Sequence, residues 1–215
     1  MTYALQSLPY LWQGLLVTLN VSALVVCISL ITGIVLGVGI VYGPRWLYWP
    51  IRYYSDFFRG IPLLVLIFFI YYGLPIVGIN FTNFISVVVA LSAFKTAHVI
   101  EVVRGAIQSI PPGQTEAGKA IGLTFGQRLL HVIAPQALRR FLPPWINAVV
   151  DTVKGSALVS LVGIVDLMLA IQQVIGRTYV PMPLYVLGAL MYFVINYSLS
   201  LASRSLEARF AYIRE

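Results

Sequence analysis

The sequence predicts an all-α integral membrane protein with five transmembrane helices and one long polar loop between the third and the fourth. Its 215 residues are 60% hydrophobic and only 10% charged, whereas charged residues make up about a quarter of a typical soluble domain. Several apolar runs reach the length of about 20 residues that a helix needs to cross a bilayer. Ten of the 14 Lys and Arg residues fall on one side of the resulting topology and only Arg177 on the other, as expected of a membrane protein. We therefore place residues 1–215 in a single transmembrane domain.

Composition also narrows the class of protein. The formal net charge is +7, but no basic cluster is interleaved with aromatic residues, so we expect lipid around the spans and no nucleic-acid partner. Cys27 is the only cysteine, which excludes an intrachain disulfide and a metal site built from thiolates. No charged residue precedes Arg45, whereas a cleaved signal peptide needs a basic start. We expect the first apolar run to be retained.

The first two predicted spans are residues 15–41 and residues 51–74. In the first, the spacing of Gly33 and Gly37 permits another helix to approach closely. The second carries Asp56 and Arg59 in its first half. Because these two lie three residues apart, they can meet on one helix face. A structural pair near the interface and a role beside a permeation path both remain open.

The third predicted span, residues 84–103, contains Lys95, His98 and Glu101 at three-residue spacing, followed by Arg104. Ionisable side chains in a membrane helix are costly unless they are paired or face a water-filled cavity. We therefore expect this row to face the interior of the helix bundle. Lys95 lies roughly 13 Å along the helix from Arg104, at about 1.5 Å per residue, and is thus deeper in the membrane.

A polar interval, residues 111–133, separates the third and fourth spans. Two consecutive prolines are predicted to end the third helix, and a short helix is expected over residues 116–121, broken at Gly122. A second short helix is expected over residues 126–133. Such a pair of polar helices can lie across the membrane surface, where a partner protein can bind it.

The last two predicted spans are residues 137–162 and residues 184–202. Pro143 and Pro144 are expected to bend or restart the fourth helix near its start. Between the two spans, residues 163–183 are amphipathic and too polar to cross a membrane. We expect a short interfacial helix and a loop there.

Charge fixes the predicted orientation. With five crossings, one side of the membrane holds only Arg177 among the basic residues, whereas the other side holds ten. Because Lys and Arg are enriched on the cytoplasmic side, the amino terminus is expected outside, with the polar interval and the carboxyl terminus in the cytoplasm. The ten are Arg45, Arg52, Arg104, Lys119, Arg128, Arg139, Arg140, Arg204, Arg209 and Arg214.

The run EVVRGAIQSIPPGQTEAGKAIGLTFGQRLLHVIAPQALRR, residues 101–140, resembles the cytoplasmic EAA loop of permease subunits in ABC importers, specifically the polar amino-acid uptake branch. Further similarity lies in residues 58–75, in residues 154–163 and in the closing Leu206, Glu207 and Arg209. The similar segments cover nearly the whole chain in the right order. Within the loop the match is carried by Glu101, Arg104, Gly105, Pro112, Gly113, Gln114, Glu116, Ala117, Gly122, Pro135, Gln136 and Ala137.

The resemblance implies a five-helix permease subunit of the bacterial cytoplasmic (inner) membrane that imports amino acids. It would form the translocation pathway with a second permease subunit, identical or related, and receive substrate from an extracytoplasmic solute-binding protein. Its short coupling helix would dock on separate ABC ATPase subunits: Gly122 allows the sharp turn after that helix, and small residues let the helix lie flush. The implied docking residues are Gly113, Glu116, Ala117, Gly118, Lys119, Ala120 and Gly122.

ATP and Mg²⁺ would be bound by the ATPase, because this chain lacks a GxxxxGK[ST] phosphate-binding loop and any catalytic motif we can identify. We expect no catalytic residue, cofactor or metal here. The chain also departs from the family pattern. Gly118 replaces a usual second alanine, Gly155 replaces a common carboxylate, Lys95 stands at a usually uncharged position and His98 at a more often aromatic one. We expect these changes to affect substrate specificity before mechanism.

Intramembrane polar residues give a hypothesis for the substrate pathway. A zwitterionic amino acid needs a cation for its carboxylate and oxygens for its ammonium group. Lys95 further suggests an acidic or carboxylate-rich substrate. Mutual neutralisation of Asp151 and Lys154 is the alternative. The candidates are Lys95, Asp151, Lys154, Ser156 and Ser160.

The outer segment, residues 163–183, is where we expect the binding protein to contact this chain, through Gln172, Gln173 and Arg177. Packing at the interface alone is the alternative for these residues. Two other classes of function stay open. An ion-coupled secondary transporter would use the intramembrane charges but is typically built from repeated halves, and a non-transporting membrane scaffold would need no polar groups at mid-membrane.

Overall fold

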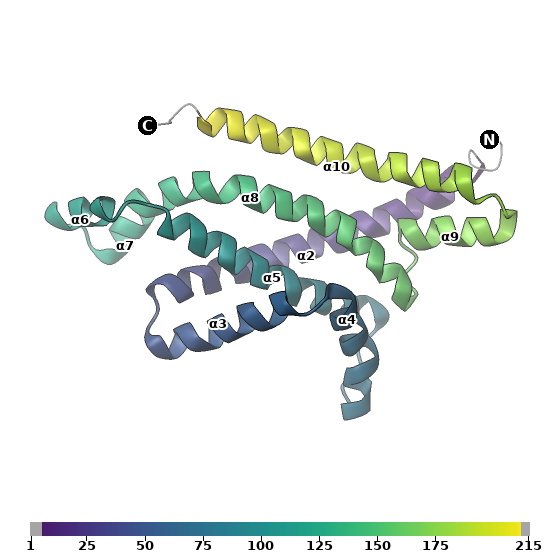
Figure 1. Cartoon of the computed structure of the whole chain (residues 1–215), viewed down its shortest axis with the longest axis horizontal. Helices are drawn as coiled ribbons and strands as arrows, with labels where there is room; N and C mark the ends of the chain where they lie inside the picture. The colour runs from purple at the N-terminus through teal and green to yellow at the C-terminus, as the bar shows by residue number, and fades with distance from the viewer. Residues whose placement is uncertain (1–5, 212–215) are drawn as a thin grey trace.

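The computed structural model describes residues 6–211, with side chains through residue 205. Four long helices run roughly along the long axis of the molecule: α2 (Leu8–Tyr42), α5 (Asn83–Gln108), α8 (Ala134–Gly155) and α10 (Pro181–Ala211) (Figure 1). No strand occurs among the described residues, which agrees with the predicted all-α class. Arg214 of the charged tail lies outside the described residues, as do the side chains of Leu206, Glu207 and Arg209.

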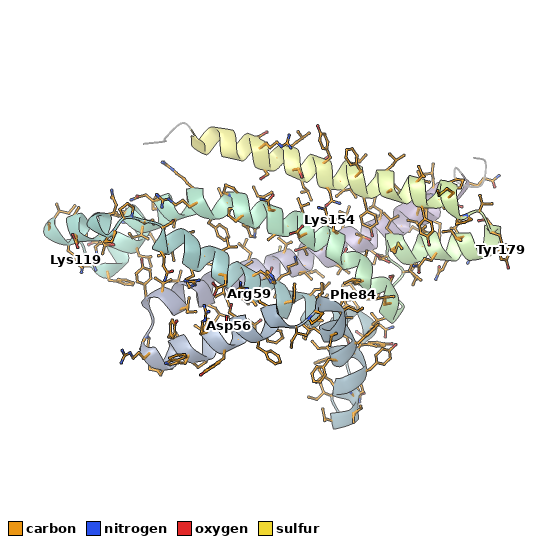
Figure 2. All side chains as sticks on the ribbon, in the orientation of Figure 1. Asp56, Arg59, Phe84, Lys119, Lys154 and Tyr179 are labelled. Carbon is orange, nitrogen blue, oxygen red and sulfur yellow. The ribbon has the colours of Figure 1, made fainter. Side chains whose placement is uncertain are left out.

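Short helices lie at the two ends of this bundle. At one end are α6 (Pro112–Ala120) and α7 (Phe125–Arg128), and at the other is α9 (Leu167–Thr178) (Figure 1). The side chains of Lys119 and Tyr179 mark the two ends (Figure 2). The predicted polar interval and the predicted outer segment therefore lie at opposite ends of the spans, as a transmembrane arrangement requires.

The second span differs from the prediction. Instead of one helix over residues 51–74, α3 (Arg45–Gly60) is followed by α4 (Leu63–Phe68), a π-helical turn at Phe69–Gly73 and a 3₁₀ turn at Leu74–Val77. The two halves are bent by 105°. The cause is Pro62, which disfavours helical backbone at the residue before it, and Ile61 is extended with φ −98° and ψ 135°. Within residues 6–211, four helices are long and apolar enough to span a membrane, or five if this bent pair is one span.

The fourth span also begins differently. The predicted second short helix is not separate, because α7 continues through a π-helical turn at Leu129–Ile133 directly into α8. Pro143 and Pro144 lie inside α8 and do not restart it. Each proline leaves one carbonyl in the preceding turn without its usual donor. Those carbonyls belong to Arg139 and Arg140, at the exposed end of the helix, where water can bond them.

The core forms where α2 crosses α5. A Cβ at Gly33 would lie 2.4 Å from Cγ1 of Val99, and one at Gly37 would lie 2.6 Å from Cβ of Val103. No larger residue fits without moving α5. The close helix approach predicted from the glycine spacing is therefore present, and it fixes the position of α5, which carries the row of ionisable side chains.

Candidate functional site

The polar end of the bundle is built around α6 and a sharp turn. The helix begins with Pro112 at its first turn and ends at Ala120, four residues earlier and one earlier than predicted. Proline favours the first helical position because its missing N–H needs no partner there. Gly122 then adopts φ +80°, a left-handed conformation that other residues rarely tolerate. The predicted turn at Gly122 is thus present and sends the chain into α7.

Two interactions hold α7 beneath this turn. Thr124 caps α7: its side chain accepts a hydrogen bond from the Gln127 N–H, while its own N–H donates to Gln127 Oε1 at 2.9 Å. Arg128 Nη1 donates to the carbonyl oxygen of Leu123 at 2.6 Å. The helix pair is therefore a defined unit connected to α8 rather than a loose polar loop.

Most of the predicted docking residues are exposed. The exception is Gly118, which is buried, and a Cβ there would lie 3.0 Å from Cγ and Cδ of Arg128. Gly118 consequently makes room for Arg128 beneath α6 and belongs to the inner side of the helix. The exposed members are Gly113, Glu116, Ala117, Lys119, Ala120 and Gly122.

The five predicted pathway residues have different environments, although Lys95 on α5 lies within electrostatic range of Asp151 on α8. Lys95 is buried on α5, and within the described residues it forms no ion pair. Asp151 and Lys154 lie 4.0 Å apart on α8 with 66% and 60% of their side chains exposed. Ser156 and Ser160 are buried and donate to carbonyl oxygens of their own helical segment, at 2.8 and 2.7 Å. The serine hydroxyls are thus satisfied locally, whereas the charged groups remain available.

A cluster that the sequence did not predict joins α3 to α5. The Glu101 carboxylate forms ion pairs with Arg104 at 2.6 Å, Arg52 at 3.4 Å and Arg59 at 3.7 Å. It also accepts a hydrogen bond from Ser55 Oγ at 3.3 Å. The four partners surround a carboxylate that is only 15% exposed. We call this group the Glu101 cluster.

The Glu101 cluster corrects the predicted pairing of Asp56 with Arg59. Asp56 instead pairs with Arg52 at 2.8 Å, one helical turn away, and Arg59 reaches across to α5. Both pairings were compatible with helical spacing. The contact with Glu101 on another helix decides between them, and spacing within one segment carries no signal for that contact.

At the end of the bundle opposite α6, hydrogen bonds and close packing hold α9 against α2. Asp166 is fully buried and caps α9 by accepting from the Leu169 N–H at 2.9 Å. Thr18 Oγ1 accepts from the Leu167 N–H at 3.1 Å. A Cβ at Gly14 would lie 2.8 Å from the carbonyl oxygen of Asp166. These contacts hold the short helix predicted for this segment against the first span.

The three predicted binding-protein contacts have different environments. Gln172 and Arg177 are exposed on α9, and the Arg177 guanidinium lies 5.9 Å from the centre of the Tyr10 ring. Gln173 is half-buried and accepts a hydrogen bond from the Tyr10 hydroxyl. Only Gln172 and Arg177 therefore offer their polar groups to a partner outside the chain.

Comparison with known proteins agrees with this architecture. Residues 29–212 match the family model described as "Binding-protein-dependent transport system inner membrane component". The probable glutamine ABC transporter permease GlnP of Bacillus subtilis is 35% identical over 96% of both chains. The arginine transport system permease ArtQ of the same organism is 32% identical over 94% of this chain and 93% of its own.

Solved structures show the same fold. A chain of "an amino acid ABC transporter with histidines" superposes with a TM-score of 0.89 at 32% identity, covering 95% of this chain and 96% of that chain. A chain of the MetNI methionine ABC transporter gives a TM-score of 0.73 at 23% identity over 92% and 96%, which supports the fold alone. Taken with the membrane-spanning bundle and its exposed EAGKAIG helix, these matches show that the chain belongs to the inner-membrane permease components of binding-protein-dependent ABC transport systems.

Proposed function

We propose that this permease imports amino acids with energy from separate ABC ATPase subunits that dock on α6. The observation that carries the proposal is the exposed helix α6, positioned at the end of the bundle by the Gly122 turn and by Arg128. A rigid helix pair joined directly to α8 can transmit motion of a docked ATPase to the spans. ATP and Mg²⁺ are bound by that ATPase in this proposal.

The amino-acid substrate is supported by relatives named for glutamine and arginine transport. The distribution of charge supports an amino terminus outside and a cytoplasmic α6, because basic residues concentrate at the α6 end. On the outer side, α9 would meet an extracytoplasmic solute-binding protein through Gln172 and Arg177. Both side chains are exposed there.

A second permease subunit is supported by the open charges on α8. Asp151 and Lys154 lie within the candidate span Phe125–Val162, yet both are exposed. A charged side chain facing lipid near mid-membrane costs about 2.5 to 3.5 kcal/mol on insertion scales. That cost disappears if this face borders a water-filled path closed by the second subunit. Lys95 and this pair are then the charged residues proposed to line the path.

The test is affinity purification of the tagged chain from native membranes, followed by mass spectrometry of the proteins that elute with it. We expect stoichiometric ATPase and permease partners for the wild type. Ala117→Trp, which adds bulk to the exposed face of α6, should lose the ATPase but keep the permease partner. Gly176→Trp is the matched control, because Gly176 lies on α9 with nothing near its Cβ position. Elution without any ATPase, under conditions that preserve known complexes, would contradict the proposal.

A further inference from the structure

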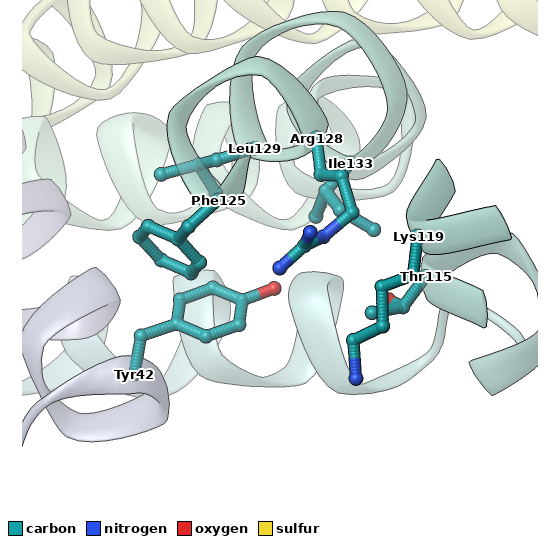
Figure 3. Close-up of a pocket in the computed structure, with 7 residues that line it drawn as sticks. All are labelled: Tyr42, Thr115, Lys119, Phe125, Arg128, Leu129 and Ile133. Carbon is teal, nitrogen blue, oxygen red and sulfur yellow. The ribbon is translucent and has the colours of Figure 1, made fainter. Parts of the chain in front are cut away.

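A cationic cavity lies between the end of α2 and the α6–α7 pair (Figure 3). Its volume is about 220 Å³. Lys119 and Arg128 supply the charge, and the Tyr42 hydroxyl points toward the Arg128 guanidinium (Figure 3). In the part of the chain that the structure describes, neither cation pairs with a carboxylate. The complete lining is Tyr42, Thr115, Lys119, Phe125, Arg128, Leu129 and Ile133.

The donors in this cavity suit an anion with several oxygens. Arg128 uses Nη1 to bond the Leu123 carbonyl oxygen, and a guanidinium has five N–H donors, so most of its donors remain. Tyr42 is held by an edge-to-face contact with Phe125, whose ring centre lies 5.2 Å away. The hydroxyls of Tyr42 and Thr115 add neutral donors. Phosphate is the biological anion that best matches this combination of Arg, Lys and hydroxyl groups.

An apolar groove adjoins this cavity. It has a volume of about 260 Å³, lies among α2, α5 and α8, and shares Leu129 and Ile133 with the cationic cavity. Every residue that lines it is hydrophobic. Ile34, its far end on α2, lies eight residues before Tyr42, which is roughly 12 Å at 1.5 Å per residue. Leu130 and Leu138 on its rim are 68% and 50% exposed and so open the groove outward.

The surroundings place the cationic cavity at the level of lipid head groups. Just beyond Tyr42, Trp46 and Trp49 are 74% and 53% exposed, and exposed tryptophans collect at membrane interfaces. An anion-binding cavity at this level, with a hydrocarbon-lined groove leading from it into the membrane, matches the two halves of one molecule. Basic pockets between transmembrane helices are known to accept anionic lipid head groups.

We propose that an anionic phospholipid binds here, with its phosphate between Arg128 and Lys119 and the upper part of one acyl chain in the groove beside Leu129 and Ile133. Because the cavity is walled by α2, α6 and α7, the bound lipid links the proposed docking helix to the first span. The site depends only on its position at the end of the spans. Because Lys119 also belongs to the proposed docking helix, lipid binding is tested without an ATPase, so that the outcome does not depend on whether α6 docks one.

The test uses the purified full-length permease in detergent, without an ATPase, and counts bound lipids by native mass spectrometry. Phosphatidylglycerol should bind more tightly than phosphatidylcholine of the same chain length. In detergent no anionic bilayer surface faces the protein, so only a basic group that contacts the bound head group should contribute, by roughly the fivefold gain in affinity that one Lys or Arg provides near a membrane. Lys119→Gln and Arg128→Gln should therefore each reduce the preference about fivefold. Arg139→Gln, the same charge change at an exposed residue outside the cavity, should leave it unchanged.

Two further experiments distinguish a bound phospholipid from other occupants of the cationic cavity. Glycerol 3-phosphate has the phosphate but no acyl chain. Phosphatidylglycerol should raise the thermal unfolding temperature, whereas glycerol 3-phosphate should not. An equal rise with both would show that the cavity binds a free anion and not a lipid. Arg128→Lys is the control for folding. It retains the positive charge at residue 128 and should therefore retain most of the preference for phosphatidylglycerol. The proposal also fails if Arg139→Gln lowers the preference as much as Lys119→Gln. If phosphatidylglycerol shows no preference, and Lys119→Gln loses the ATPase in the separate affinity purification, an acidic side chain of the ATPase is the occupant instead.

Discussion

Two groups of charged residues at the membrane spans have opposite environments. The Glu101 cluster joins two helices and surrounds a carboxylate that is 15% exposed with three guanidinium groups. The Asp151–Lys154 pair lies on one helix, at 4.0 Å, with both side chains more than half exposed. The first group is satisfied within the chain, whereas the second is open at a depth where lipid cannot solvate it. The Glu101 cluster therefore stabilises the subunit, whereas the Asp151–Lys154 pair is available to contact a partner, a substrate or water.

The largest effect is expected from Glu101→Gln. The substitution keeps the shape of the side chain but leaves Arg104, Arg52 and Arg59 with Asp56 as the one counter-charge among the described side chains. Removing one partner from a buried ionic group typically costs about 3 to 5 kcal/mol, and the lower end of this range is expected because the three arginine side chains are 30 to 40% exposed. Thermal unfolding of the purified permease should therefore shift strongly to lower temperature.

Asp56→Asn is the matched control for Glu101→Gln. It removes the Arg52–Asp56 ion pair, in which the two side chains are 34% and 49% exposed, and exposed pairs contribute about 0 to 1 kcal/mol. If both variants unfold at the same temperature as the wild type, the Glu101 cluster does not stabilise the contact between α3 and α5.

An intermediate effect on stability is expected at Asp166, a buried carboxylate that forms no ion pair with the described residues. Burial raises the pKa of Asp166 to about 6, although backbone N–H groups at the start of α9 oppose the rise. The folded chain thus keeps this proton up to about pH 6, while the unfolded chain releases it near its ordinary value of 3.8. Since the folded state binds more protons between these values, stability falls as pH rises through this window.

Asp166→Asn should remove that fall, because asparagine cannot titrate yet still caps a helix. A difference of about two pKa units corresponds to roughly 2 to 3 kcal/mol. Relative to the wild type, the variant should gain about this much stability between pH 4 and pH 7, measured by denaturant unfolding at each pH. An unchanged difference across that range would show that Asp166 is not held protonated by burial.

Local patterns predicted the parts of the fold that depend on neighbours in sequence. The spacing of Gly33 and Gly37 predicted the tight approach of two spans, and Gly122 predicted the turn after α6. Pro62 is also a local signal for the break in the second span, but the prediction of one span over residues 51–74 did not use it. Proline at this depth is tolerated because neighbouring helices can compensate for the lost backbone bonds.

Contacts between distant segments could not be predicted in the same way. Neither Arg59 meeting Glu101 nor Arg128 lying beneath Gly118 follows from spacing along one helix, since each depends on how two elements pack. For the same reason, the five pathway candidates were grouped by depth alone. The structure separates the buried serines, which bond their own helix, from the exposed charges.

The smallest effect on stability is expected at Asp151 and Lys154. Lys154→Gln breaks only an exposed pair on one helix, so its unfolding temperature should match that of the wild type within about 1 kcal/mol of stability. Uptake of radiolabelled amino acid by reconstituted complexes should nevertheless fall at least tenfold, if this open charge lines the path.

Exchanging the two residues, Asp151→Lys with Lys154→Asp, distinguishes the remaining explanations. The exchange preserves the pair and its net charge but reverses the position of each charge. If the pair serves only to neutralise itself, the exchanged chain should transport as well as the wild type. If the charges contact substrate or the second subunit, folding should be retained while uptake stays low, because the cation then lies about 4.5 Å, or three residues of helical rise, from where it is needed. Full recovery of uptake would therefore assign the Asp151–Lys154 pair to the same class as the Glu101 cluster.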